Sequence, residues 1–250
     1  MVDSLTPGRH DFGIQNSEAI MLSLPAHPAL IDQVYETLRD AICTLDLAPG
    51  ERLRQAELAE RLGVSRQPVS HALQLLKRDG LVQESGRKGL AVAEIDPERI
   101  RQRYEVREAL DALAARLAAR RAGAGALSEA ERNALEQPFS GTDGDGAPPA
   151  ATLLSADRAF HTALYRASGN PEIEAVIAPH WPHLMRAMAV VLRESGAARR
   201  TWDEHTLILR HILDGDEHTA AEAARTHAAR AGASMIRRLE SRQTGPGDRP

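Results

Sequence analysis

The chain has 250 residues and a formal net charge of −4, and aromatic residues make up only 3% of it. This length suits two modest domains with cores of Leu, Ala and Val, and the negative charge argues against indiscriminate nucleic-acid binding. The single cysteine excludes an intramolecular disulfide framework. We find no signal peptide and no apolar run long enough to span a bilayer, so we expect a soluble cytoplasmic protein.

The first predicted helix covers residues 31–45 and ends at Ala48-Pro49-Gly50. Residues 1–28 before it lack consistent periodicity and are expected to be flexible. Cys43 lies on the apolar side of this helix, where we favour a small buried hydrophobe over a redox sensor. The apolar side comprises Val34, Leu38, Ala41, Ile42 and Leu45.

The pattern of residues 55–80 predicts a pair of short helices of the kind that binds DNA in its major groove. Ala59, Leu62 and Val64 flank Gly63, a residue suited to the tight turn between the helices. Ser65 is predicted to cap the second helix, since its hydroxyl can accept hydrogen bonds from the next turn of backbone. Apolar residues fall on one face of that helix, and the other face carries groups suited to base edges and phosphates. These candidate DNA-binding residues are Arg66, Gln67, Ser70 and His71.

The segment after this pair distinguishes a DNA-reading domain from an ordinary helical hairpin in a globular core. Residues 80–84 and 90–93 predict two short strands around the basic turn Ser85-Gly86-Arg87-Lys88-Gly89. Such a pair of strands forms a wing, whose Arg87 and Lys88 are placed to hold phosphates. Residues 29–95 are therefore predicted to form a winged helix-turn-helix.

The order LRDAICTLDLAPGERL, ELAERLGVSRQPVSHAL and LVQESGRKGLAV resembles the DNA-binding domain of the GntR family of bacterial regulators. That family usually has Ser-Arg-Thr-Pro-Val-Arg-Glu-Ala-Leu where this chain has Gln67, Ser70 and His71 at the third, sixth and seventh positions. The apolar positions are intact, but the operator sequence of other members cannot be carried over. Gln67 suits bidentate pairing with adenine, and a polar residue that only solvates the helix is an equal alternative.

Longer helices follow Asp96, which is predicted to cap the first of them with Pro97 in its first turn. They cover about residues 97–122, 128–137, 152–168, 171–194, 199–214 and 217–241, with a loop at 139–151. Six helices without a strand pattern predict an antiparallel helical bundle over residues 96–241, followed by a flexible tail at 242–250. The expected fold is mainly α, with a small β-wing in the first domain.

Four residues of the bundle are candidate metal ligands. Asp157 and His161 are four residues apart and share one helix face. His205 lies ten residues before Gly215 and His227 twelve after it, so in an antiparallel pair both lie roughly 15–18 Å from the turn. Where the three helices meet, a carboxylate and three imidazoles would suit Zn²⁺, Mn²⁺, Ni²⁺ or Fe²⁺. With ten histidines in a mostly helical chain, such spacing also arises by chance.

Neighbouring side chains are expected to stay outside this site. His180 and His183 lie beside two prolines that make the helix irregular, and we favour surface or packing roles for both. His218 lies near a helix start and is expected to be solvated. Glu204 is expected to point away from the site.

The segments DRAFHTALYRASGNPEI and DEHTLILRHILDGDEHTAAEAARTH resemble the FCD effector-binding domain of the FadR branch of GntR regulators. The Asp-x3-His of that pattern matches Asp157 and His161, its Glu-His matches Glu204-His205, and its closing His matches His227. The resemblance covers about residues 31–240. It implies a divalent metal at Asp157, His161, His205 and His227, with Zn²⁺ as the first candidate, and a carboxylate-bearing metabolite that completes the coordination.

Two residues are assigned to this effector. Arg107 is a candidate clamp, because a guanidinium can bind a carboxylate through two hydrogen bonds. A surface salt bridge with Glu108 or Asp111 is the preferred alternative for Arg107. Asn170 is the second assigned residue.

We expect a ligand-responsive transcription regulator, a repressor that binds operator DNA as a homodimer. Effector binding would shift the helix at 97–122, tethered to the first domain through residues 94–96, and change the spacing of the two heads. A metal-dependent enzyme at the same site is the alternative, although His-Glu-x-x-His, Gly-x-Ser-x-Gly and a phosphate-gripping glycine-rich loop are missing. A structural zinc in a constitutive DNA-binding protein is a third possibility, which a chelator would reveal by unfolding the second domain.

Overall fold

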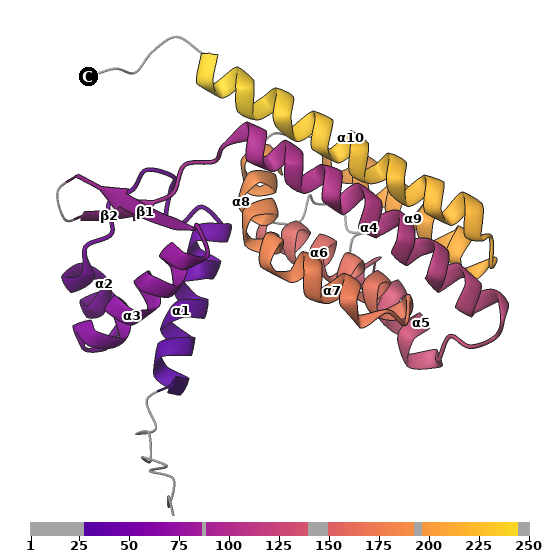
Figure 1. Cartoon of the computed structure of the whole chain (residues 1–250), viewed down its shortest axis with the longest axis horizontal. Coiled ribbons are helices and arrows are strands. Elements are labelled where there is room, and N and C mark those ends of the chain that lie inside the picture. The colour runs from indigo at the N-terminus through magenta and orange to yellow at the C-terminus, as the bar shows by residue number, and fades with distance from the viewer. Residues whose placement is uncertain (1–27, 87–88, 140–149, 193–196, 245–250) are drawn as a thin grey trace, which may run out of the picture.

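The computed structural model describes residues 28–86, 89–139, 150–192 and 197–244, and in them the chain is mainly helical, as expected (Figure 1). The elements are α1 (Pro28–Cys43), α2 (Gln55–Leu62), α3 (Arg66–Arg78), β1 (Val82–Ser85), β2 (Gly89–Val92), α4 (Pro97–Gly123), α5 (Glu129–Glu136), η1 (Gln137–Phe139), α6 (Ala150–Ala167), α7 (Pro171–Ile177), η2 (Ala178–His180), α8 (Trp181–Leu192), α9 (Ala197–Leu213) and α10 (Glu217–Thr244). One cluster of buried residues spans 34–92 and a second spans 95–239. None of the helices in these ranges is long and apolar enough to cross a membrane.

The first part of the chain, residues 28–86 and 89–95, is here called the head, and its central element is α3. Pro68, Val69, Ala72, Leu73 and Leu76 bury one side of this helix, as the apolar spacing predicted. The turn before α3 contains Gly63 at φ 65°, in the left-handed region that glycine adopts at little cost. Ser65 occupies the N-cap position but makes no side-chain capping hydrogen bond, so that detail of the prediction was wrong. Its side chain is exposed, where water can replace the backbone donors.

The wing has the predicted form. β1 and β2 pair antiparallel, with Val82 opposite Val92 and Ser85 opposite Gly89. The basic tip residues Arg87 and Lys88 lie outside the described residues, so their phosphate contacts stay a prediction. Cys43, at the end of α1, is buried and free, and burial raises the pKa of its thiol to about 11. A thiol with so high a pKa is rarely ionised, which agrees with the packing role expected for it.

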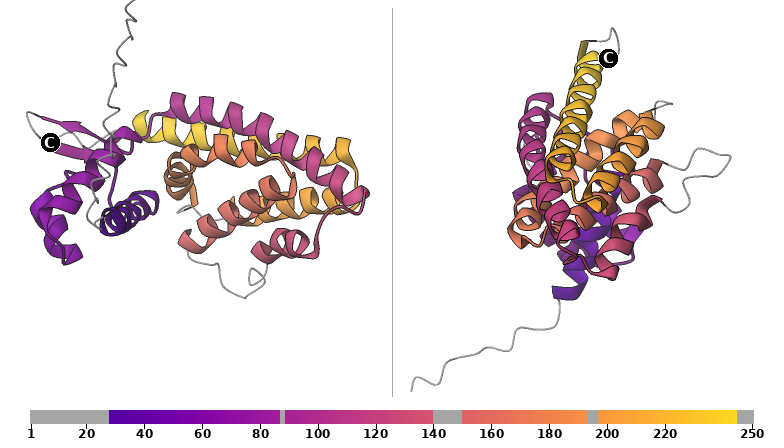
Figure 2. Two further views of the ribbon diagram at one scale, coloured as in Figure 1. Left: turned by 60° about the horizontal axis from the view of Figure 1, so that its bottom comes forward. Right: turned by 90° about the vertical axis from the view of Figure 1, so that its right-hand side faces the viewer.

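The helical part is organised around α4 and α10, which lie side by side along their lengths in both views of Figure 2. Small residues allow this close approach. A Cβ atom added to Gly232 of α10 would lie 2.8 Å from Cβ of Tyr104. The fully buried alanines of the two helices are Ala114, Ala115, Ala118, Ala119, Ala220, Ala224 and Ala228.

The predicted helix at 171–194 is divided. α7 ends at Ile177, the 3-10 turn η2 follows, and α8 begins at Trp181. Pro179 and Pro182 explain the break, because proline lacks the amide hydrogen that a continuous helix needs and is tolerated in a first turn. α10 also extends to Thr244, three residues beyond its expected end.

Gly215 closes the turn between α9 and α10 and fixes the relative height of the residues on these helices. Its φ is +74°, and a Cβ atom there would lie 2.9 Å from Cα of Gly123 at the end of α4. We predict that Gly215→Ala lowers the free energy of unfolding by about 2–4 kcal/mol, the cost of a left-handed alanine plus a backbone clash. Urea denaturation of the full chain measures this.

Gly125→Ala is the matched control for this substitution. Gly125 also has a positive φ, +66°, but no atom lies within 4 Å of its added Cβ. Only the conformational cost of about 1 kcal/mol is therefore expected. Equal losses in the two variants would show that the approach of Gly215 to Gly123 has no energetic consequence.

Candidate metal centre and DNA-reading helix

The structure brings together the four predicted metal ligands. Asp157 and His161 come from α6, His205 from α9 and His227 from α10. All four side chains are buried, and one ligand atom of each lies within 4.8 Å of those of the other three. His205 lies ten residues before Gly215 and His227 twelve after it, and their rings lie at about the same level, as the sequence predicted.

The distances and the missing partners fit a metal site. Nε2 of His205 lies 3.1 Å from Nε2 of His227 and 3.5 Å from Oδ1 of Asp157. Two nitrogens bound to one ion at about 2.1 Å lie roughly 3.0–3.4 Å apart at ordinary coordination angles. Oδ2 of Asp157 and Nε2 of His161 are buried without a hydrogen-bond partner. Such orphaned polar atoms are costly unless they bind something, so these residues could hold a divalent cation.

Two carboxylates support the candidate ligands from behind. Oε2 of Glu204 accepts a hydrogen bond of 2.8 Å from Nδ1 of His227, which leaves Nε2 of that ring facing the cluster. Glu204 therefore does not point away from the site, and that expectation was wrong. Oδ2 of Asp111 lies 3.4 Å from Nδ1 of His161. A carboxylate behind an imidazole fixes the ring orientation and raises its basicity as a ligand.

Arg107 lies inside the domain beside the cluster. Its side chain is 1% exposed, with Nε 3.2 Å from Oδ2 of Asp111 and Nη2 3.8 Å from Oδ2 of Asp157. Asp111 was correctly named as a partner, but the pair is buried and not on the surface. The other partner considered, Glu108, instead accepts a hydrogen bond from Arg225. The role of Arg107 as a clamp for an effector stays a prediction.

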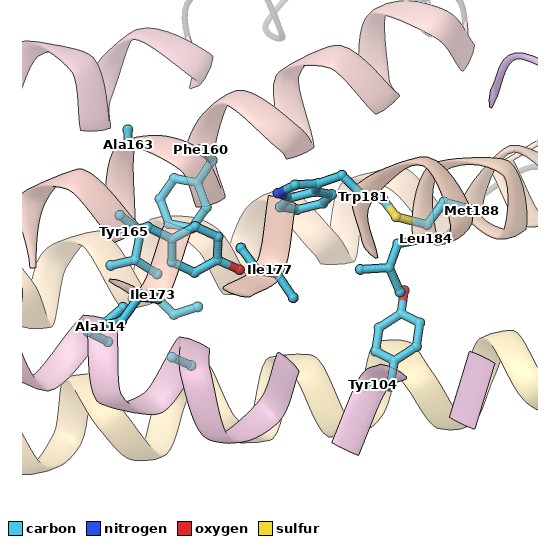
Figure 3. Packing of buried hydrophobic residues seen from close by; sticks show 14 of the residues in the cluster. Tyr104, Ala114, Phe160, Ala163, Tyr165, Ile173, Ile177, Trp181, Leu184 and Met188 are labelled. Atoms are coloured by element: carbon cyan, nitrogen blue, oxygen red, sulfur yellow. The ribbon is translucent and has the colours of Figure 1, made fainter. Parts of the chain in front are cut away.

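Sequence reasoning missed Trp181 and Tyr165. The Tyr165 hydroxyl donates a hydrogen bond to Oδ1 of Asp111, and the guanidinium carbon of Arg107 lies 5.1 Å from the centre of the Trp181 ring. Figure 3 shows these two rings in the buried interior with Phe160, whose ring stacks on His205 at 4.3 Å. These aromatic residues form the walls beside the candidate ligands.

Burial keeps the rings of His161 and His205 neutral. It lowers the pKa of His161, with Arg107 as a further cause, and it lowers that of His205 well below its usual value. Neutral imidazole is the form that binds metals. Burial alone would raise the pKa of Asp111, but the charge of Arg107 and the hydrogen bond from Tyr165 hold that pKa well below its usual range. Asp111 is therefore ionised, and the rings of His161 and His205 are uncharged.

The remaining predicted residues lie elsewhere. His218 is exposed, as expected, and His183 is buried with Nε2 2.9 Å from the carbonyl oxygen of Asp79, a packing role. His180 is half-buried. Asn170 caps α7, where its Oδ1 accepts a hydrogen bond from the amide of Glu172. The role of Asn170 in effector binding stays a prediction.

The second candidate site is the outer side of α3. Arg66, Gln67 and His71 are exposed and Ser70 is half-buried, opposite the buried apolar side of the same helix. The antiparallel wing follows directly in the chain. An exposed polar helix face beside a wing is the arrangement with which winged helices enter a major groove.

Comparison with known proteins agrees with this arrangement. The model for "Bacterial regulatory proteins, gntR family" matches residues 30–92, and the model for "FCD domain" matches residues 102–230. The chain belongs to the GntR family of transcription regulators, in the FadR-like branch with an FCD domain. It is therefore a DNA-binding regulator, and the enzyme alternative is wrong.

Individual relatives are also regulators. An "Uncharacterized HTH-type transcriptional regulator in unstable DNA locus" of Streptomyces ambofaciens is 35% identical over 199 residues, 78% of this chain and 80% of that protein. The "Nta operon transcriptional regulator" of Aminobacter aminovorans is 34% identical over 125 residues, 50% of this chain and 57% of that protein. The "HTH-type transcriptional repressor RspR" of Escherichia coli K12 is 37% identical over 87 residues, 35% of this chain and 38% of that protein.

Solved structures share the fold. "E. coli McbR/YncC" superposes with a TM-score of 0.67 at 22% identity, covering 86% of this chain and 99% of that one. A "putative transcriptional regulator GntR" from Rhodococcus sp. RHA1 gives a TM-score of 0.65 at 22% identity, over 83% of this chain and 98% of that one. These likenesses concern the fold alone.

Glu204 offers a test of the candidate metal centre that leaves the four ligands in place. We predict that Glu204→Gln weakens the binding of Zn²⁺ to the full chain by about 10–100-fold, because the amide orients His227 without a negative charge. Calorimetric titration measures the affinity. Asp203→Asn, an exposed neighbour on the same helix, is the control and should change the affinity little. Equal effects of both substitutions would indicate that only the local charge matters.

Proposed function

We propose that the chain is a repressor whose DNA affinity is set by a small organic acid bound at a divalent metal held by Asp157, His161, His205 and His227. It works in the cytoplasm as a homodimer on an operator with two half-sites. The observation that carries this proposal is the buried Asp/His cluster, which lies in the same chain as an exposed DNA-reading helix. When bound, the metal supplies a Lewis-acidic centre for a carboxylate oxygen.

The charges around the cluster favour an anionic effector. The fully buried side chains Arg107, Asp111 and Asp157 carry formal charges that sum to −1, and the charge of the partly exposed Glu204 is offset by its ion pair with Arg230. A divalent cation would change the sum to +1. A buried net charge is costly unless it is compensated, and one carboxylate compensates it. Nη2 of Arg107 is buried without a hydrogen-bond partner and is therefore available to a second carboxylate oxygen.

The dimer and the repression are supported by more general arguments. A two-fold dimer presents two recognition helices to successive major grooves, which matches the symmetry of an inverted repeat. The relative RspR, 37% identical to this chain over 87 residues, is named a repressor. The effector would act by favouring one arrangement of the two heads over another.

The DNA-reading helix can be tested on operator DNA selected from a random library by the purified full chain. We predict that Arg66→Ala weakens binding to the selected sequence by about 10–100-fold, the loss expected when one base-reading guanidinium is removed. Fluorescence anisotropy measures the affinity. Arg237→Ala, at an exposed position on α10, is the control and should bind normally. Unchanged affinity in Arg66→Ala would remove this residue from the DNA interface.

The effector site can be tested with a panel of mono-, di- and tricarboxylic acids. With Zn²⁺ or Mn²⁺ present, we predict that at least one acid raises the melting temperature of the wild-type chain by several degrees, as ligand linkage requires. His227→Ala should abolish this shift, because it removes a metal ligand. His218→Ala, at an exposed position on the same helix, should retain it. A shift that survives in His227→Ala would place acid binding elsewhere.

A chelator separates a regulatory metal from a structural one. On our proposal, removing the metal abolishes the response to the acid and leaves the helical domain folded, as measured by circular dichroism. Unfolding of that domain by the chelator would instead support a structural metal in a constitutive DNA-binding protein.

A further inference from the structure

We propose that Arg186 and His183 of α8 are positioning residues, which transmit a change at the metal pocket to the recognition helix α3. This inference rests on the proposed function only in one respect: in the cell, binding of the metal and the effector is what would change the pocket. α8 lies between the head and the layer formed by α4 and α10 (Figure 1). It is a separate short helix because η2 divides it from α7.

One end of α8 forms part of the pocket wall. Trp181, its first residue, is buried, and its ring centre lies 5.9 Å from that of His161. The same ring lies under the guanidinium of Arg107. A shift of either residue on occupation of the pocket must therefore displace Trp181 or compress it, because packed interiors leave little free volume.

Two residues further along, α8 contacts the end of the recognition helix. Nε2 of His183 donates a hydrogen bond of 2.9 Å to the carbonyl oxygen of Asp79, the C-cap residue of α3. The carbonyl groups in the last turn of a helix lack partners within that helix, so this side chain satisfies one of them. The amide of Asp79 in turn donates to the carbonyl of Leu75 within α3.

Arg186 provides a second connection, to the segment between β2 and α4. Nη1 donates to the carbonyl oxygen of Ala93 at 2.8 Å, and Nη2 donates to that of Glu94 at 2.6 Å. The amide of Ala93 donates to the carbonyl of Leu81, and the amide of Leu81 donates to that of Leu76 in α3. A continuous series of hydrogen bonds thus joins Arg186 to the recognition helix.

The Arg186 contact is demanding in its geometry. The side chain is buried, and none of the ion pairs found among the described residues includes it. Two neutral carbonyl groups therefore replace the water that a guanidinium loses on burial, and that loss is costly. A small displacement of α8 would lengthen or break these hydrogen bonds, so the contact is sensitive to the position of α8.

The test is hydrogen exchange in the full chain, followed at the amides of Asp79, Leu81 and Ala93. Each of these amides is hydrogen-bonded in the head. We expect Arg186→Met to speed their exchange about tenfold, the size expected for a lost hydrogen bond to a charged group. Trp181→Phe, which alters only the pocket end of α8, should speed exchange at the same amides. The double variant should exchange like Arg186→Met alone, because the connection is already broken.

Whether the effects of Arg186→Met and Trp181→Phe on exchange add shows whether the two residues are coupled or stabilise the head independently. If the two substitutions add, Arg186 supports the head without transmitting anything from Trp181, and the proposal is wrong. It is equally wrong if Trp181→Phe leaves these amides unchanged. Arg237→Met, an exposed arginine on α10, is the control and should exchange like the wild type. If Arg186→Met fails to fold, Arg186→Lys removes the two-pronged contact but keeps the charge, and serves in the same cycle.

A second experiment changes the pocket by adding Zn²⁺ instead of by substituting Trp181. Added Zn²⁺ should change exchange at these amides in the wild type and not in Arg186→Met, while calorimetry gives a similar Zn²⁺ affinity for both. A wild-type chain that binds Zn²⁺ without any change at these amides would contradict the proposal. If the wild type binds no Zn²⁺, the proposed metal site fails, whereas the cycle with Trp181→Phe still judges the role of α8.

Discussion

The buried pairing of Arg107 with Asp111, beside Asp157, is the interaction on which the helical domain depends. Taking charged groups out of water costs several kcal/mol for each ion unless partners are placed with accuracy. α4 supplies Arg107 and Asp111, and α6 supplies Asp157, so these two helices can pack in few ways that leave no charge unpaired. The same two carboxylates face His161. Satisfying the charge on Arg107 therefore also positions groups of the candidate metal centre.

Small side chains allow this polar interior to exist. Alanines line the contact between α4 and α10, and Gly232 admits the ring of Tyr104. Close helices leave little apolar volume to fill, which is how a chain with few aromatic residues still makes a packed core. Three of its eight aromatic residues, Phe160, Tyr165 and Trp181, surround the cluster of candidate metal ligands.

The sequence predicted what depends on local spacing. The helices, the wing and the matched heights of His205 and His227 follow from periodicity and from the position of Gly215. The direction of Glu204 and the burial of Arg107 depend on how helices are rotated against one another, which one helix cannot reveal. A signal for Arg107 was present nonetheless, since Tyr104, Arg107 and Asp111 recur at helical spacing with the buried alanines of α4. The division at 178–180 could have been inferred from its two prolines.

His183 and Arg186 of α8 donate their hydrogen bonds to the main-chain oxygens of Asp79, Ala93 and Glu94. Every amino acid carries such an oxygen, so substitutions on the outer side of α3 leave these contacts unchanged. A duplicated copy of this gene could therefore acquire a new target sequence in few steps without losing its link to the sensor. Exchanging recognition residues between relatives is therefore a practical way to make biosensors that bind a different operator and still respond to the original effector.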